Sequence, residues 1–477
     1  MRTPIRVTSR FAHIFVEAMS GTSLATAAPP QWYPVGASAV RTKGAKAQAE
    51  HPYKPREDFR GHPAAGTDII KLHKAANADF DGYSIPSGSI GTAPDIGPAM
   101  KAGGWDEHNP GGNTTIAASP ASTVTSLQVA DASGISAKDI VLVNGEVAYV
   151  VTSDGNTPGV LTVWPPLTSA PSSGNDVKTA CYYVPSNTRD VTEQSLAAWI
   201  GSNRTQMRVL GWVPEKWVWD FGGDDAGNCT VEGAAREAQR ITGCLLNGSI
   251  NNSTVTITVD DANIVPDDVS ATRPVSLTIE ADGTNAEEHV ICTAKSGNDL
   301  TVTRGAHGSS GVAHDDDSVI RPFFPAETIA GTPVPSILGS VCIGSTSDTA
   351  RTEYQLKSAQ VDADLAVNKK EDVLGEQWKL QGYSLGMRNI AISLEGWADD
   401  ATQLLSRQAE DMETASVLVQ QGDTEGSIVG FFCLNALFDN PADDPSADEM
   451  GVSLSGRALH ASADSDTDPR EVVIFFA

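Results

Sequence analysis

The stretch spanning residues 211–235, GWVPEKWVWDFGGDDAGNCTVEGAA, constrains the fold of this chain more than any other. Trp217, Trp219 and Phe221 stand at every second position, so in an extended chain they share one face. The glycine- and aspartate-rich run 222–228 supplies turn residues, and a second alternating run follows it and ends at Gly233. The pattern predicts a β-hairpin with a large apolar face.

The end of this hairpin has echoes later in the chain. Ile390, Ile392 and Leu394 alternate before Glu395 and Gly396, so that SLEGWA echoes TVEGAA, and VSLSGRAL (452–459) has a similar form. The order strand, loop, strand, EG(A/W)A and helix occurs at 205–242 and again at 355–411. We therefore predict a mainly β fold with two tandem β-barrel or sandwich units and short flanking helices, two of which span 231–242 and 399–411.

Two further segments have the same pattern as each other. GEVAYVVTSDGNTPGVLTV (145–163) aligns with AEEHVICTAKSGNDLTV (286–302), and SLQVADA (126–132) aligns with TITVDDA (256–262). Short β-rich runs separated by Gly, Asp, Ser and Pro turns are typical of small all-β domains. The sequence predicts two copies of one small all-β module, inserted at 113–181 and 251–321.

The remaining segments complete the predicted domain organisation. Residues 1–75 have little periodicity and several prolines, so we expect an extended N-terminal arm held by a neighbouring subunit. Residues 76–112 with 182–250 are expected to form the first β unit, and residues 322–477 the second. Within them we expect a strand near 83–90, a short helix over 96–101, a long polar excursion over 368–389, and final strands near 450–461 and 471–476.

The charge balance excludes some partners. The chain has 60 acidic and 33 basic side chains and a formal net charge of -27. Phosphate binding requires Lys and Arg, so the protein is not expected to hold nucleic acid tightly or to bind an anionic membrane. An acidic surface would let DNA pass without sticking, although simple solubility or a salty habitat also explains the charge.

The cysteines and the N-terminus carry no further signal. The six cysteines form no CxxC pair, which favours reduced thiols in the core over zinc or redox sites. No apolar run has the length of a membrane helix, so we expect no membrane insertion. The start of the chain imitates a signal peptide, but His13 and Glu17 interrupt its apolar part.

Candidate chemical motifs are weak. SGTSLATA (20–27) resembles the serine-nucleophile segment of subtilisin-like proteases, but Ser23 has no room upstream for the aspartate and histidine motifs. The acidic run 464–468 lacks the glycine and the final glutamate of a calcium loop, and His314 with the three aspartates after it fits a hydrated loop. Trp212, Trp217 and Trp219 favour packing over a carbohydrate platform. No nucleophile, base and oxyanion donor occur together, so we expect no enzyme activity, no cofactor and no metal.

Parsed in this way, the chain resembles the tail tube proteins of long-tailed bacteriophages. The likeness is carried by SGSIGTAPDIGPAMKAGG (87–104), by the hairpin of 211–235, by SAQVDADLAVNKKEDVLGEQWKLQGYSLGMRNIAISLEGWADD (358–400) and by the closing segment 450–477. LTVTRGAHGSSGVAHDDDSVI (300–320) is similar to a β module of phage structural proteins. The two inserted modules depart from a plain tube protein.

The resemblance implies a structural virion protein, located in the tail and assembled in the host cytoplasm. Each tube unit would contribute strands to a continuous β-barrel that lines a DNA channel, and rings would stack through loops and arms. Two units in one chain imply trimeric rings with pseudo-sixfold symmetry; one unit would imply hexamers. The expected partners are other copies of the chain, other tail proteins, and viral DNA that passes through without specific binding during genome ejection.

The same resemblance assigns roles to three groups of residues. The expected lumen-facing acids are Asp362, Asp364, Glu232 and Glu395. The expected core or subunit-interface aromatics are Trp217, Trp219, Phe221 and Trp397. The expected inter-ring loop contains Lys369, Lys370, Glu371 and Asp372.

Three alternatives stay open at this point. A distal tail or adaptor protein would share the tube-like units. A carbohydrate-binding adhesive protein would explain the paired β modules and the tryptophans. A hydrolase would rest on Ser23 alone.

Overall fold

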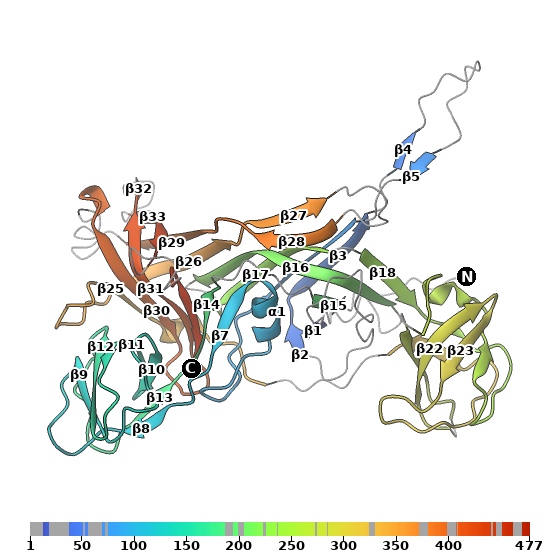
Figure 1. The fold of residues 1–477 in the computed structure, drawn as a ribbon, viewed down its shortest axis with the longest axis horizontal. Helices are drawn as coiled ribbons and strands as arrows, with labels where there is room; N and C mark the ends of the chain where they lie inside the picture. The colour runs from blue at the N-terminus through green and yellow to red at the C-terminus, as the bar shows by residue number, and fades with distance from the viewer. Residues whose placement is uncertain are drawn as a thin grey trace.

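A computed structural model of the protein describes residues 13–18, 38–50, 53–55, 69–71, 75–186, 194–198, 205–222, 226–235, 237–271, 274–283, 285–323, 330–371, 380–397, 407, 409–439, 442–444, 451–460 and 470–477. The fold of these residues is mainly β, as the alternating patterns predict (Figure 1). A long layer of strands crosses the molecule, and two small β domains lie below its two ends in the view of Figure 1.

The long layer is antiparallel throughout. From one edge to the other its described strands are β3 (Gly44–Glu50), β6 (Ala75–Tyr83), β17 (Asn228–Ala235), β16 (Thr205–Gly222), β26 (Leu356–Asp364), β29 (Asn389–Trp397), β33 (Gly451–Leu459) and β32 (Ala442–Asp444). The predicted hairpin of 211–235 is therefore confirmed as β16 and β17.

Two smaller sheets pack behind this layer. One contains β2 (Ser38–Arg41), β1 (His13–Ala18), β15 (Gln194–Ala198), the first half of β16, and β18 (Glu237–Thr242). The other contains β25 (Ser340–Gly344), β30 (Thr414–Gln421), β31 (Val429–Phe438), β34 (Val473–Phe476), β14 (Cys181–Pro185) and β7 (Trp105–His108). The main apolar core includes residues from the layer, from both of these sheets and from helix α1 (Gly97–Ala102), which confirms the predicted helix over 96–101.

The pairing registers reveal a tandem duplication. Strands β3 and β6 continue into the small hairpin β4 (Tyr53–Pro55) and β5 (Ile69–Lys71), just as β26 and β29 continue into β27 (Val367–Glu371) and β28 (Leu380–Leu385). Glu50 pairs with Ala75 as Asp364 pairs with Asn389, and Tyr53 pairs with Lys71 as Val367 pairs with Leu385. Each residue follows its counterpart by 314 positions (364 against 50, 385 against 71), so neither copy has an insertion over 44–83 or 358–397.

The second half of each unit is duplicated as well. Pro214 opposes Gly233 as Phe438 opposes Gly456, so the long strand β16 corresponds to β31 followed by β32, and β17 corresponds to β33. The strands behind the layer follow the same rule: β15 matches β30, β1 matches β25, and β18 matches β34. Even the β-bulge is shared, lying between Gln194 and Leu196 in one unit and between Ala415 and Val417 in the other. We call β1–β6 with β15–β18 unit 1, and β25–β34 unit 2.

The two inserted segments form two closed six-stranded barrels. Barrel 1 contains β8 (Asn113–Thr115), β13 (Asp176–Thr179), β10 (Ile140–Val143), β11 (Glu146–Ser153), β12 (Gly159–Trp164) and β9 (Ser126–Val129). Barrel 2 contains β19 (Cys244–Leu245), β24 (Val319–Pro322), β21 (Val275–Ile279), β22 (Glu288–Ser296), β23 (Asp299–Thr303) and β20 (Thr256–Thr258), with the 3-10 helix η1 (Ala262–Ile264). Bridges between Ile116 and Val129 and between Leu246 and Val259 close the two barrels.

The barrels differ in how they attach. Barrel 1 shares a core with the back of unit 2, where Tyr149 and Trp164 pack on Phe432. The Gln420 side chain of β30 accepts a hydrogen bond from the Val147 N–H and donates one to the Gly145 carbonyl. Barrel 2 has an apolar core of its own, to which Ile241 of β18 is added.

The two barrels also differ in the partner of one glutamate, which is buried in barrel 2 and half-buried in barrel 1. Glu146 and Glu288 occupy matching positions at the start of β11 and β22, four residues before a shared β-bulge. Within barrel 2, Arg304 binds Glu288 through two hydrogen bonds of 2.6 Å. Glu146 instead pairs with Arg351, which reaches it from unit 2 at 3.3 Å. The counter-ion of Glu146 in barrel 1 therefore comes from unit 2.

Several expectations need correction. The helix predicted over 231–242 is wrong, because this segment forms β17 and β18 and pairs along the sheets. The strand predicted near 83–90 is also wrong, since β6 ends at Tyr83. The extended arm expected for residues 1–75 is wrong in its described part: β3 is a full member of the layer, and β1 pairs with β15. The helix predicted over 399–411 lies mostly outside the described residues.

Candidate functional surface: the polar face of the layer

The four predicted lumen-facing acids lie on one face of the layer. In an antiparallel sheet, side chains of directly opposed residues point to the same side. One row of opposed residues across the sheet reads Asp79, Glu232, Lys216 and Asp364. The next row contains Asp362, and Glu395 lies farther along the same side of β29. Glu232, Asp364 and Glu395 are exposed, and Asp362 is half-buried.

Cations are interspersed with the acids on this face, since Lys46 opposes Asp79, and Arg457, opposite Ala391, lies on the same side of the layer. Lys216 contacts Asp362 at 2.8 Å, and this hydrogen bond, together with the charges of Glu232 and Asp364, raises the pKa of Lys216. Burial and the neighbouring charge of Glu395 raise the pKa of Asp220, against the opposing effect of Lys43. Like charges therefore lie close enough on this face to affect one another's ionisation.

The opposite face of the layer holds the hairpin aromatics. Trp217 and Trp219 are fully buried and stack at 5.3 Å, and Trp105 meets Trp219 edge-on at 5.2 Å. Phe221 is buried beside Phe431. These three hairpin aromatics are core residues of the chain itself, and Trp212 is buried too, with its N–H donating to the Ala78 carbonyl. The three tryptophans are 0% exposed and present no ring face to a soluble ligand.

Trp397 differs from the other predicted aromatics. It is 41% exposed and belongs to the polar face, with the ammonium of Lys357 3.4 Å from its ring centroid. Its counterpart in unit 1, 314 positions earlier, is Tyr83, and Lys43 lies 3.9 Å from that ring centroid. The two units thus repeat a cation–π pair at the same end of the layer.

The predicted inter-ring loop is described only in part. Lys369 lies in β27 and forms a 2.6 Å ion pair with Glu215 of β16. Lys370 and Glu371 also belong to β27, which pairs with β28. Asp372 lies outside the described residues. The polar excursion expected over 368–389 is therefore a β-hairpin in its described part.

The two edges of the layer are complementary. Among the described strands, β3 pairs only with β6, and β32 pairs only with β33. Inside the chain, their counterparts β26 and β16 pair with each other, and Asp220 opposes Gln360 at that junction. The same register between two chains would place Asp444 of one copy opposite Lys46 of the next. An unpaired edge as long as β3, which has seven residues, can pair with a strand of another chain.

The remaining motifs do not form a chemical site in the described structure. Ser23 and the acidic run 464–468 lie outside the described residues. His314 is buried in barrel 2, with Nε2 3.4 Å from Glu288 and Nδ1 3.7 Å from Asp282. Within the described part of the chain, no group of three or more His, Cys, Asp or Glu side chains is arranged to hold a metal ion.

Sequence reasoning missed part of this surface. The sequence echo pairs SLEGW of β29 with TVEGA of β17, whereas the register matches it with DFDGY of β6 (residues 79–83). The signals for the true match were a lysine at the start of each first strand, Lys43 and Lys357, and a Gly-aromatic pair ending each second strand, Gly82-Tyr83 and Gly396-Trp397. The hairpin of β30 and β31 was also missed, although SVLVQQGDTEGSIVGFFCL has alternating apolar runs around a turn.

Comparison with known proteins gives no assignment. None of the described helices is long and apolar enough to cross a membrane. No protein-family model matches the chain, and no curated protein matches it significantly.

Proposed function

We propose that this protein is a structural tube subunit of a phage tail, and that its copies join edge to edge into rings enclosing a channel. The observation that carries the proposal is the internal junction of β16 and β26, where unit 1 pairs with unit 2. That junction consists of the counterparts of the two free edges, so repeating it between chains continues the layer without a new kind of contact.

The proposal extends to the shape of the assembly. A head-to-tail interface generates a closed ring when its rotation closes, and an open helix otherwise. With two equivalent units per chain, we propose trimeric rings with pseudo-sixfold symmetry. The polar face, which carries Asp362, Asp364, Glu232 and Glu395, would line the channel, because the apolar face is already buried by the strands behind it.

An acidic channel wall suits the passage of DNA. Phosphates gain no counterion release from carboxylates, so a duplex would slide past this face without being held. The barrels, which lie on the other side of the layer in Figure 1, would then project outward from the ring.

Charge exchange at the free edges tests the proposal. Lys46→Asp places a carboxylate opposite Asp444 of the next copy, and Asp444→Lys places two lysines together. We expect each single variant to remain monomeric in sedimentation velocity, and the double variant to recover rings visible by negative-stain microscopy.

Arg407→Asp serves as the control, because it changes the same charge at an exposed position outside the layer. The proposal fails if the native protein is a monomer at every concentration and salt, or if Lys46→Asp assembles as well as the native chain.

A further inference from the structure

The outer face of strand β21 in barrel 2 is covered in part by two histidines. Ser276 and Thr278 flank the core residue Leu277, so their side chains point out of the barrel, yet they are only 4% and 0% exposed. Nε2 of His307 lies 3.0 Å from the Ser276 hydroxyl, and Nδ1 of His289 lies 3.1 Å from the Thr278 hydroxyl. Each imidazole ring therefore holds a hydroxyl group that has little access to water.

Phe323 joins the two rings into one cluster. It is the first residue after β24, where the chain leaves the barrel, and it is buried. Its ring stacks on His307 with 4.0 Å between centroids and meets His289 edge-on at 4.6 Å, and the two histidine rings are 6.4 Å apart. Its backbone N–H donates to the Ser276 carbonyl at 3.1 Å. The histidines thus pack the point of exit from barrel 2 against β21.

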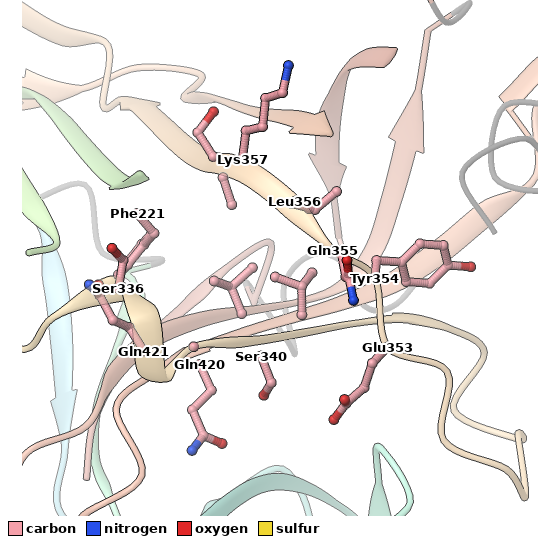
Figure 2. A pocket seen from close by; sticks show the side chains of 15 residues that line it. Phe221, Ser336, Ser340, Glu353, Tyr354, Gln355, Leu356, Lys357, Gln420 and Gln421 are labelled. Atoms are coloured by element: carbon pink, nitrogen blue, oxygen red, sulfur yellow. The ribbon is translucent and has the colours of Figure 1, made fainter. Parts of the chain in front are cut away.

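The connection from barrel 2 to unit 2 is held differently at its other end. Gln421 of β30 donates from Nε2 to the Val334 carbonyl at 2.8 Å, and Pro335 forms a bridge with Ala226. Ser336 then begins the 3-10 helix η2 (Ser336–Leu338) and lines a cavity of about 410 Å³ between β25, β30 and the first residues of β26 (Figure 2). These contacts with unit 2 involve groups that do not titrate, whereas the contacts at the barrel end include two imidazoles.

The matching face of barrel 1 has apolar residues instead. Leu142 opposes Val147 in barrel 1 as Thr278 opposes His289 in barrel 2, and Val147 and His289 each follow the matched glutamate. Leu142 and Val147 belong to the core that barrel 1 shares with unit 2. A position that fixes barrel 1 by apolar burial therefore holds an ionisable group in barrel 2.

The surroundings of the two histidines disfavour a positive charge. The charged groups around the pair are Glu280, Glu287, Glu288 and Arg321. Burial lowers the pKa of both histidines below the ordinary value of 6.5, and the charge of His289 lowers the pKa of His307 further. Glu287 and Glu288 raise the pKa of His289, and Arg321 lowers it. Near neutral pH both rings are therefore uncharged.

We propose that His289 and His307 form a pH-sensitive latch, which holds Phe323 against β21 while both rings are neutral and releases it when they are protonated. Two imidazolium rings 6.4 Å apart repel each other, and burial makes each charge costly. A base whose pKa is lowered in the closed form stabilises that form at high pH and loses this contribution as the pH falls below the ordinary value, here 6.5. Mild acid therefore loosens the barrel end of the connection and leaves its end at Val334 in place. The latch belongs to the single chain and does not depend on ring assembly.

Hydrogen exchange on the full chain tests the latch. Between about pH 7.5 and about pH 5, a range in which histidines titrate, the peptide covering 304–323 should lose protection several-fold after correction for intrinsic exchange rates. His289→Gln with His307→Gln should abolish this loss, because a glutamine amide can hydrogen-bond the same hydroxyls but takes up no proton. Peptides from β11 and β12 of barrel 1 serve as the internal control and should not change.

Two charge variants test the direction of the effect. Glu287→Gln removes a carboxylate that favours protonated His289, so the loss of protection in mild acid should be larger than in the native chain. Arg321→Gln removes a cation that disfavours protonated His289, so the loss should be smaller. His108→Gln is the matched control, because His108 of β7 also has a pKa lowered by burial but lies outside barrel 2, and the loss at 304–323 should equal that of the native chain.

Unchanged protection of 304–323 in the native chain in mild acid, or an equal loss in the His289→Gln, His307→Gln variant, would overturn the inference. If that double variant does not fold, Glu287→Gln and Arg321→Gln decide the question. Opposite changes in the loss of protection support the latch, and changes in the same direction contradict it.

Discussion

At the scale of single residues, Glu288 shows how a charge can be kept inside a small barrel. Its side chain is fully buried, and Arg304, itself only 7% exposed, binds it at both carboxylate oxygens. Backbone N–H groups of Gly305 and Val312 complete the set of donors. A buried ion pair contributes little net stability when intact, but removing one partner leaves an uncompensated charge.

Arg304→Met is therefore expected to destabilise barrel 2 by about 3–5 kcal/mol, because Glu288 loses its counter-ion. Hydrogen exchange of peptides from β21–β23, followed by mass spectrometry on the full chain, measures this effect. Exchange in β10–β12 of barrel 1 is the internal control and should not change. Equal protection of β21–β23 in native and variant chains would show that the pair is dispensable.

Acid should loosen barrel 2 for a related reason. Burial alone would raise the pKa of Glu288, but the hydrogen bonds from Arg304, Val312 and Gly305 hold it below the usual value. The Asp315 N–H, with Asn285 and Ser318, lowers the pKa of Asp282 to about 2. Groups with depressed folded-state pKa values stabilise the fold above their unfolded values, about 4, and lose that contribution as the pH falls.

We therefore expect the protection of β21–β24, corrected for intrinsic exchange rates, to fall between about pH 4 and pH 2. In Asp282→Asn the decline should be smaller, because the variant has already lost part of the pH-dependent contribution. A pH-independent protection in the native protein would contradict the assigned shifts.

At the scale of elements, the sequence predicted most of the strands but not which strand of unit 1 corresponds to which strand of unit 2. The alternation of Trp217, Trp219 and Phe221 indicates a strand with one buried face, and the structure has that strand. VEGAAREAQRIT has helix-forming residues, yet pairing with β6 and β16 makes it two strands, because partners remote in sequence decide the outcome. No local pattern shows that the hairpin β3–β6 of unit 1 corresponds to β26–β29 of unit 2. The pairing register shows it, because equivalent residues are always 314 positions apart (397 against 83).

The sequence predicted the polar face of the candidate surface but not its free edges. Alternation places Asp362 and Asp364 on one face of one strand, and the structure adds that Glu232 and Glu395 share that face. The free edges of β3 and β32 were not predictable, since an edge is defined by which strand fails to pair, a property of the whole sheet.

Two matching glycines test the duplication. Gly233 of β17 and Gly456 of β33 occupy equivalent positions opposite Pro214 and Phe438. A Cβ on Gly456 would lie 2.4 Å from the Leu437 carbonyl oxygen, and one on Gly233 would lie 2.3 Å from Trp212 Nε1 and 2.8 Å from the Val213 carbonyl oxygen.

Alanine at either position should destabilise the layer by about 1–3 kcal/mol, because the nearby backbone has no room to move. Denaturant unfolding followed by tryptophan fluorescence measures it. Gly222→Ala is the control, since its Cβ would meet only Asp220 Oδ1 at 3.5 Å. If Gly222→Ala has a lower denaturant midpoint of unfolding than the Gly233 and Gly456 variants, the close backbone approach at those two glycines is not the cause of the destabilisation.

At the scale of the whole molecule, the charge of -27 and the acids on one face would oppose assembly into the proposed ring. Closing a channel lined by carboxylates brings like charges together from all copies, and salt screens this repulsion over about 10 Å at 0.1 M and about 3 Å at 1 M. Assembly through this layer should therefore depend on ionic strength.

We expect the ring fraction in sedimentation velocity to rise between about 0.1 M and 1 M sodium chloride. Asp364→Asn with Glu232→Gln should assemble at lower salt than the native chain, since both positions are exposed on the polar face. Glu413→Gln, exposed outside the layer, is the matched control. A ring fraction that falls with salt would contradict this account of the channel wall.

Each barrel begins and ends on neighbouring strands, so the chain enters and leaves it at nearly the same place. In barrel 2, Cys244 opposes Ile320, so the chain leaves the barrel about one strand spacing, ~5 Å, from where it enters. A short linker can therefore span the gap left by the domain, although its removal uncovers Ile241 of β18 and takes the Pro274 carbonyl away from Arg208. Barrel 1 also begins and ends on paired strands, but its removal would expose Phe432 and Phe475. Barrel 2 is thus easier to replace than barrel 1, and a foreign domain with adjacent termini is best inserted in place of residues 244–322.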